Sequence, residues 1–424
     1  MRSIHALVLF TLFILPSVVH AQGESGGLIP ETSAARHGLT RSWYAQADIN
    51  ASSSRINAVS LHHGTLFATS DKGLIQAWNA ETGEKLWAEQ LGSGIHPASE
   101  VGASEKVAAV THGTTLYMFE RATGKSLGKR NLGGVPSAAP AVAGNFVYVP
   151  MRRELLEVHE ILRDNDHAPT TYTSLGRSSF PPIAGYESII WTTDKGHLYT
   201  ISIAGGPRNQ MEAYGGIGAG MSYHSPFVFV GSLGGYVYAF HEVNGRTLWR
   251  FTAEEAVRQA PIVVNDAVYV IPELGGMFRL NATTGIEEWH APQIKRFVAA
   301  GKKRVYAMDA VDRMVVLDAA SGARIDVLPI GGFTLPIANW STDRIYLAND
   351  NGLVQCLREI DAKEPTSYDA PKPKAKEEKS SEKSRLKKAD GDTAKGDEAK
   401  GDAAKSEPMK EAAPATTDKV DPFK

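Results

Sequence analysis

The stretch FVFVGSLGGYVYAFHEVNGRTLW, from Phe227 to Trp249, decides the fold. Two short runs rich in aromatic and β-branched residues flank Gly234-Gly235, and a second turn at Asn244-Gly245 leads to a third run. Alternation of large and small residues is the period-2 pattern of a strand, and a Gly-Gly pair adopts the positive φ angles of a tight hairpin. The stretch therefore predicts three antiparallel strands joined by two tight turns.

This pattern recurs along the chain. A hydrophobic-aromatic pair marks each copy, weakest at Ala109-Val110, and the second members of the pairs are Phe67, Val110, Tyr148, Trp191, Phe229, Tyr269, Tyr306 and Tyr346. Successive members are 43, 38, 43, 38, 40, 37 and 40 residues apart. A period near 40 with four short strands per repeat is typical of a β-propeller. We predict an all-β fold, an eight-bladed propeller of four-stranded antiparallel blades.

The two ends of the repeat array complement each other. The segment SWYAQADI, from Ser42 to Ile49, resembles the last strand of a repeat, whereas the eighth repeat stops before a fourth strand. We expect the N-terminal strand to enter the final blade and close the ring, which leaves no unpaired end blade. The propeller is predicted to span residues 41–360.

The segments outside the propeller differ from it in composition. Residues 1–21 have the charged start, apolar run and small residues before the cleavage site that are typical of a secretory signal peptide. Residues 22–40 are rich in Gly, Ser, Ala and Pro, and we interpret them as a flexible lead-in. Residues 361–424 carry as many basic as acidic residues and few apolar ones, so we predict a disordered polyampholyte tail.

Composition excludes several classes of function. The 424-residue chain has a formal net charge of −2, which does not favour a nucleic-acid partner. Its single cysteine, Cys356, excludes an intramolecular disulfide and a cysteine-based metal cluster, and its apolar surroundings indicate a buried side chain. His62 and His63 would point to opposite faces of a strand, so they do not form a metal clamp. We expect no catalytic, cofactor-binding or metal-binding residues.

The second turn of each repeat carries a motif. Examples are AWNAETGEKLW (77–87), AFHEVNGRTLW (239–249) and RLNATTGIEEW (279–289). These segments resemble the repeat of the pyrroloquinoline-quinone-like propeller superfamily, and the resemblance covers about residues 41–360. It implies that the repeat tryptophans pack between blades and that the repeat glycines form turns. The structural positions are Gly83, Trp87, Gly124, Gly245, Trp249, Gly285, Trp289 and Gly322.

The resemblance implies one of two functions. Quinone-dependent dehydrogenases of this superfamily hold pyrroloquinoline quinone and Ca²⁺ in a central funnel, and many have a vicinal cysteine pair. BamB-type proteins are eight-bladed scaffolds of similar length that help to assemble outer-membrane barrels. They are typically lipoproteins, whereas no cysteine follows the predicted cleavage site at Ala21.

Specificity is expected where the repeats are least regular. Repeats three and four have longer polar segments at 160–171 and 205–211, and Arg152-Arg153 replaces the usual polar hairpin turn. We interpret Arg152 and Arg153 as an exposed basic pair that contacts a partner.

These observations favour an exported, non-enzymatic, monomeric propeller that acts as a protein-interaction scaffold in the periplasm or cell envelope. We expect one or more envelope proteins as partners, no N-terminal lipid anchor, and no membrane span after signal cleavage. The alternative is a quinoprotein oxidoreductase with a reduced cofactor site. Glycan binding at the channel mouth is a third option.

Overall fold

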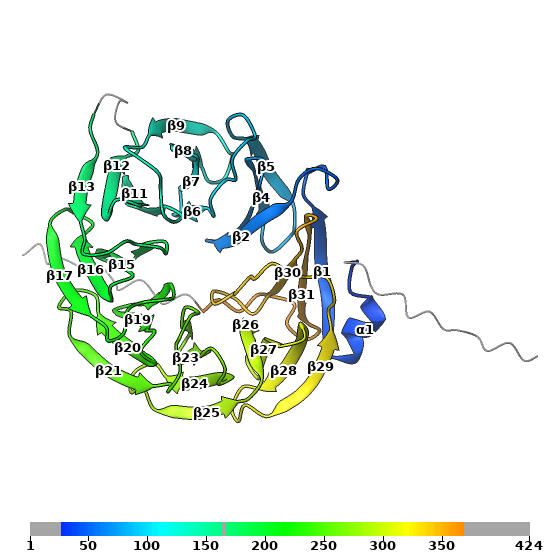
Figure 1. Ribbon diagram of the computed structural model, residues 1–424. Helices are drawn as coiled ribbons and strands as arrows, with labels where there is room; N and C mark the ends of the chain where they lie inside the picture. Colours follow the sequence, from blue (N-terminus) through cyan, green and yellow to red (C-terminus); the bar gives the residue numbers. More distant parts are fainter. Residues whose placement is uncertain (1–26, 163–166, 369–424) are drawn as a thin grey trace, which may run out of the picture. The chain divides into compact units, whose positions relative to one another are not determined.

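The computed structural model describes residues 27–162 and 167–368. The predicted signal peptide and nearly all of the predicted tail lie outside these residues. Within them the chain forms eight antiparallel sheets arranged as the blades of a propeller (Figure 1). The fold prediction is confirmed.

Seven blades are consecutive four-stranded meanders. Blade 1 contains β2 (Ile56–His62), β3 (Thr65–Ser70), β4 (Leu74–Asn79) and β5 (Lys85–Gln90). Blade 2 contains β6 (Gly102–Ala103), β7 (Val107–His112), β8 (Thr115–Glu120) and β9 (Ser126–Asn131). Blade 3 contains β10 (Ala141–Ala143), β11 (Phe146–Met151), β12 (Leu155–Glu160) and β13 (Thr170–Thr173). Blade 4 contains β14 (Ile183–Ala184), β15 (Ser188–Thr192), β16 (His197–Ser202) and β17 (Pro207–Glu212).

The remaining blades follow the same order. Blade 5 contains β18 (Met221–His224), β19 (Phe227–Gly231), β20 (Tyr236–His241) and β21 (Thr247–Thr252). Blade 6 contains β22 (Ile262–Val264), β23 (Ala267–Val270), β24 (Met277–Asn281) and β25 (Glu287–Ala291). Blade 7 contains β26 (Ile294–Ala300), β27 (Arg304–Asp309), β28 (Arg313–Asp318) and β29 (Arg324–Pro329). Blade 8 joins β30 (Ile345–Ala348) and β31 (Leu353–Glu359) to β1 (Leu39–Gln46).

Blade 8 closes the ring with the N-terminal strand, as predicted. Trp43 of β1 pairs with Cys356 of β31 in an antiparallel ladder. The blade has three named strands rather than four, because the expected inner strand is reduced to single bridges. Leu335 pairs with Ala348, while the Asn339 N–H bonds the Val298 carbonyl of blade 7 instead. The intervening Pro336 has no N–H for a ladder.

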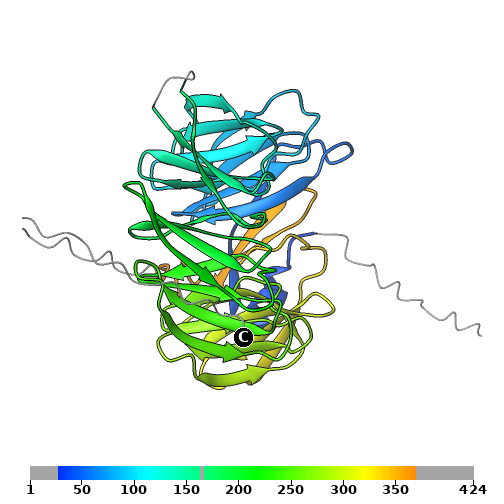
Figure 2. The same ribbon diagram turned by 60° about the vertical axis from the view of Figure 1, so that its left-hand side comes forward.

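Burial follows the position of each strand within its blade. In Figure 1 the first strands lie toward the ring centre and the fourth strands at the rim, and Figure 2 shows turns of successive blades at both faces of the ring. Second strands such as β3 and β7 are buried at every residue, because a neighbouring blade covers each face. In the outer strand β5 only Trp87 is buried. The core is therefore a series of apolar layers between successive blades.

The lead-in is more ordered than its composition indicates. Residues Glu31–Arg36 form the helix α1, which lies beside β1 (Figure 1). Ile29, Ala34 and Leu39 are buried in an apolar cluster with residues of blades 7 and 8, and this contact stabilises the short helix. The expectation of a flexible lead-in over 22–40 is therefore wrong for residues 29–39.

The ordered chain also extends past the predicted boundary at 360. Residues 361–368, which we call the C-terminal strap, pair with the segment before β30 through a Thr342–Ser367 bridge. The Tyr368 side chain is buried in the cluster between blades 6 and 7. The Arg344 guanidinium donates to the carbonyl oxygens of Ala362 and Lys363 at 3.0 and 2.9 Å.

Candidate functional site

One face of the ring is built from two kinds of segment. These are the turns between the second and third strands of each blade and the connections that lead to the next blade, because antiparallel order brings both to the same end. Backbone hydrogen bonds join them. The Arg152 N–H donates to the Val135 carbonyl at 3.1 Å, and the Ser174 N–H donates to the Glu154 carbonyl at 2.9 Å. We call this end of the ring the loop face.

Large apolar side chains are exposed on the loop face over adjacent blades. Four successive blade-to-blade connections each present one, namely Ile95, Val135, Leu175 and Tyr214, with exposed fractions of 74%, 50%, 63% and 72%. The other four connections, at 253–261, 292–293, 330–334 and 47–55, present none. We call these four residues the apolar arc. Neighbouring exposed apolar side chains of this kind are typical of a protein-interaction surface.

A group of exposed basic side chains lies within the span of the apolar arc. Arg152 and Arg153 occupy the β11–β12 turn, Arg177 the connection after β13, and Lys195 the β15–β16 turn. None of the four forms an ion pair with a described residue. The Asp194 carboxylate accepts a hydrogen bond from the Arg177 backbone N–H at 3.0 Å.

The repeat tryptophans and glycines lie on the opposite face, where they join adjacent blades. In four junctions the tryptophan of one outer strand lies beneath the turn glycine of the next blade, and a Cβ on that glycine would approach the indole to within 2.5–2.7 Å. The pairs are Trp43 with Gly83, Trp87 with Gly124, Trp249 with Gly285, and Trp289 with Gly322. Each indole N–H also donates to a backbone carbonyl of that turn, at 2.8–3.1 Å.

The junctions from blade 2 to blade 5 lack this tryptophan contact. No tryptophan lies on β9, β13 or β17, and Gly245 packs against Asn209 and Met211 instead. Val135, Leu175 and Tyr214 of the apolar arc lie in these three connections. The β23–β24 and β27–β28 turns also present exposed apolar side chains on the loop face, Leu274 and Val311, so this exposure extends beyond the irregular repeats.

The donor groups for a resident metal do not converge. In the part of the chain that the structure describes, no three His, Cys, Asp or Glu side chains are grouped to hold an ion. Burial, and then the nearby Glu81 carboxylate, raises the pKa of the Cys356 thiol to about 12, so this thiol stays protonated. These residues do not fit the oxygen-rich Ca²⁺ site or the cysteine pair of a quinone funnel.

Of the exposed residues on the loop face, the sequence singled out Arg152 and Arg153 but not the apolar arc. The structure places Arg152 and Arg153 as exposed residues in the β11–β12 turn at this face, where the Arg152 N–H bonds the Val135 carbonyl. The arc residues Ile95, Val135, Leu175 and Tyr214 were missed, because they lie in connections that follow no repeat pattern. The signal that could have found them is an apolar residue isolated among Gly, Ser and Pro.

The comparisons identify similar proteins. A family model described as outer membrane protein assembly factor BamB matches residues 71–166 and 187–335, more than half of the chain. Among solved structures, BamB from Moraxella catarrhalis is 17% identical with a TM-score of 0.60, covering 76% of this chain and 99% of that chain. A computationally designed protein, Ika8, is 16% identical with a TM-score of 0.56, covering 73% and 98%.

The propeller fold itself is shared more widely. The C-terminal WD40 domain of Sif2 is 10% identical with a TM-score of 0.56, covering 76% of this chain and 98% of that domain. No curated protein matches the chain. Among the described residues, no helix has both the length and the apolar character needed to cross a membrane.

Proposed function

The chain belongs to the family of outer membrane protein assembly factor BamB, and on this premise we propose that it is a non-enzymatic protein-interaction scaffold of the cell envelope. Its partner would be one or more envelope proteins. The propeller would act as an exported monomer.

The observation that carries this proposal is the apolar arc with Arg152 and Arg153 inside its span. Exposed apolar side chains supply area for burial, and arginines are enriched in protein interfaces because they combine stacking with several hydrogen-bond donors. The partner surface should therefore be partly apolar and acidic.

The competing function is a quinoprotein oxidoreductase that uses pyrroloquinoline quinone and Ca²⁺. The lone, protonated Cys356 and the scattered carboxylates favour the scaffold over this enzyme. No described residue is assigned a catalytic role.

The test combines cofactor titration with capture of partners. Purified protein is mixed with pyrroloquinoline quinone and Ca²⁺, and is separately immobilised and exposed to solubilised envelope proteins. The proposal expects no saturable spectral shift, no dye-linked alcohol oxidation, and specific retention of an envelope protein. Cofactor-dependent alcohol oxidation would overturn it.

A further inference from the structure

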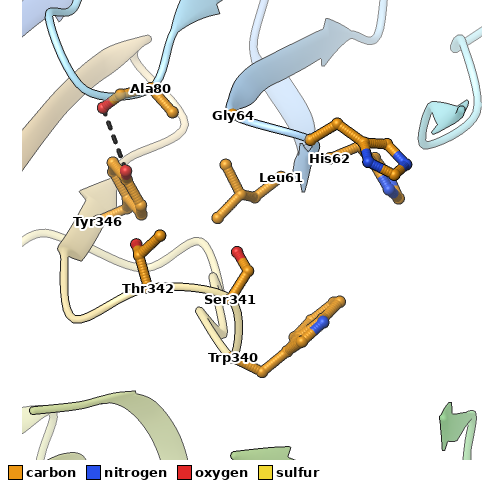
Figure 3. A pocket seen from close by; sticks show the side chains of 9 residues that line it. Leu61, His62, Gly64, Ala80, Trp340, Ser341, Thr342 and Tyr346 are labelled. Atoms are coloured by element: carbon orange, nitrogen blue, oxygen red, sulfur yellow. Dashed lines mark hydrogen bonds between the residues drawn. The ribbon is translucent and has the colours of Figure 1, made fainter. Parts of the chain in front are cut away.

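A pocket of about 320 Å³ lies between blade 1 and blade 8, on the face opposite the loop face (Figure 3). Blade 1 contributes the β2–β3 turn, and blade 8 contributes the segment before β30 and Tyr346. The lining residues are Leu61, His62, His63, Gly64, Ala80, Trp340, Ser341, Thr342 and Tyr346. The volume lies at the small end of the range for ligand pockets, roughly 300–1,000 Å³.

Trp340 is unusual because a large aromatic ring remains exposed at the pocket. Its exposed fraction is 46%, whereas the repeat tryptophans are buried. Its place in the chain differs too, since it lies in the 340–344 connection rather than on an outer strand. In Figure 3 the indole lies at one side of the pocket, on the same segment as Ser341 and Thr342.

Hydrogen bonds from the buried side chain of Asn339 fix the segment that carries Trp340. Asn339 is 1% exposed, and its Oδ1 accepts the N–H groups of Ser341 and Thr342 at 3.1 Å each. Its Nδ2 donates to the Arg344 carbonyl at 2.7 Å. Preorganisation of this kind lowers the entropy that a ligand must overcome on binding.

The facing wall is equally fixed. The Tyr346 hydroxyl and the Trp43 indole N–H both donate to the Ala80 carbonyl, at 3.1 and 2.9 Å. The side chains of Leu61 and Tyr346 add an apolar surface beside these groups (Figure 3). The pocket therefore combines rigid apolar surfaces with backbone and hydroxyl oxygens.

Carboxylate, ammonium and guanidinium groups are absent from the residues that line the pocket. Burial, and then the neighbouring His63, lowers the pKa of His62 to about 4, so this imidazole is neutral. The nearby Arg344 is fully buried and paired with Glu81 and Asp343. A charged ligand would lose its hydration here without gaining an opposite charge.

We propose that this pocket binds a neutral saccharide, with one sugar ring stacked on the Trp340 indole. The hydroxyls of Ser341 and Thr342 would bond the sugar hydroxyls. An aromatic face beside a few uncharged polar groups suits a ligand that presents C–H groups on one side and hydroxyls around its edge. This binding site is separate from the loop face and goes beyond the scaffold function.

The test observes the indole groups directly. The full chain contains seven tryptophans, so a ¹H–¹⁵N correlation spectrum resolves seven indole signals, and Trp340→Phe assigns the one of interest. Maltose, cellobiose and diacetylchitobiose serve as neutral probes. We expect at least one of them to shift the Trp340 signal saturably while the other six signals stay in place.

Controls separate binding from folding. Calorimetry should show a dissociation constant about tenfold higher for Trp340→Ala, the loss expected for one aromatic stacking contact. The six remaining indole signals report that the variant is folded, and Tyr214→Ala on the loop face should bind as the wild type does. The proposal is wrong if no probe shifts Trp340 saturably, or if glucuronic acid binds as tightly as the neutral sugars.

Discussion

The turn glycines of the repeat satisfy two constraints at once. Gly285 has a φ of +70°, where a side chain is strained, and a Cβ there would lie 2.5 Å from Trp249. Gly64 has nearly the same φ, +72°, but no atom lies within 4 Å of its Cβ position. A comparison of substitutions at the two glycines therefore distinguishes the cost of backbone strain from the cost of steric overlap with the indole.

Replacement of each glycine by alanine should give different losses. Gly64→Ala should lower the free energy of unfolding by about 1–2 kcal/mol, the cost of a left-handed conformation. Gly285→Ala should lower it by about 2–5 kcal/mol, because overpacking against the indole adds to that cost. Urea unfolding measures both, and equal losses would show that the tryptophan contact contributes nothing.

The ionisation of Glu242 should make the stability of the fold depend on pH. It is 2% exposed, its Oε1 accepts the Tyr223 hydroxyl at 3.0 Å, and its Oε2 has no hydrogen-bond partner among the described residues. Burial raises the pKa of this carboxyl above its ordinary value of 4.5. The folded protein therefore binds this proton more tightly than the unfolded chain does, and stability falls as pH rises above 4.5.

The variant Glu242→Gln should remove this ionisation. Because glutamine stays neutral, the melting temperature of the variant relative to wild type should be higher at pH 7.5 than at pH 4. Thermal unfolding at the two pH values measures the difference. If the offset is the same at both, Glu242 does not titrate with a raised pKa.

At the scale of elements, the repeat pattern located the strands but not all of their registers. The ladders align Phe229 with Ala239 and Trp249 in blade 5. In blade 2 the equivalent residue is Ala109, which pairs with Met118, rather than Val110. In blade 4 it is Ile190, which pairs with Thr200, rather than Trp191. Side chains alternate between faces, so a one-residue offset invisible to a 40-residue period changes which blade a residue contacts.

Short or non-repeating elements escaped sequence reasoning for a different reason. The polar segment at 205–211, singled out as irregular, is strand for most of its length, since β17 begins at Pro207. Helix α1 is six residues long, too short for a helical period to be visible. The C-terminal strap has the composition of the charged tail, and contacts that lie far apart in the sequence hold it in the fold, namely those of Arg344, the Thr342–Ser367 bridge and the buried Tyr368 side chain.

The strap leads to a prediction about truncation. Deletion of 361–424 removes the Tyr368 side chain from the core and two carbonyl partners from buried Arg344, each loss costing about 1–3 kcal/mol. Deletion of 372–424 leaves the strap intact and should change stability by less than about 0.5 kcal/mol. Denaturant unfolding compares the two, and equal effects would show that the strap is not part of the fold.

At the scale of the whole molecule, the most regular repeats and most of the surface that we propose for partner binding lie in different blades. Blades joined by tryptophan contacts, such as 5 to 7, follow the repeat and explain the ring. Blades 2 to 5, whose junctions lack that tryptophan, carry Arg152, Arg153 and most of the apolar arc. The fold was predictable because it rests on repetition. The loop-face surface was not, because its residues come together only when the ring closes.

The most direct measurement of the central claim compares two exposed basic pairs on opposite faces. Arg152→Glu with Arg153→Glu reverses the charge within the apolar arc, and Lys302→Glu with Lys303→Glu does so on the turn between β26 and β27. Each variant is immobilised, and the envelope protein retained by the wild type is quantified by mass spectrometry. We predict at least about tenfold less protein on the first variant and wild-type retention on the second. Equal retention by both variants, or a loss confined to the lysine variant, would contradict partner binding at the loop face.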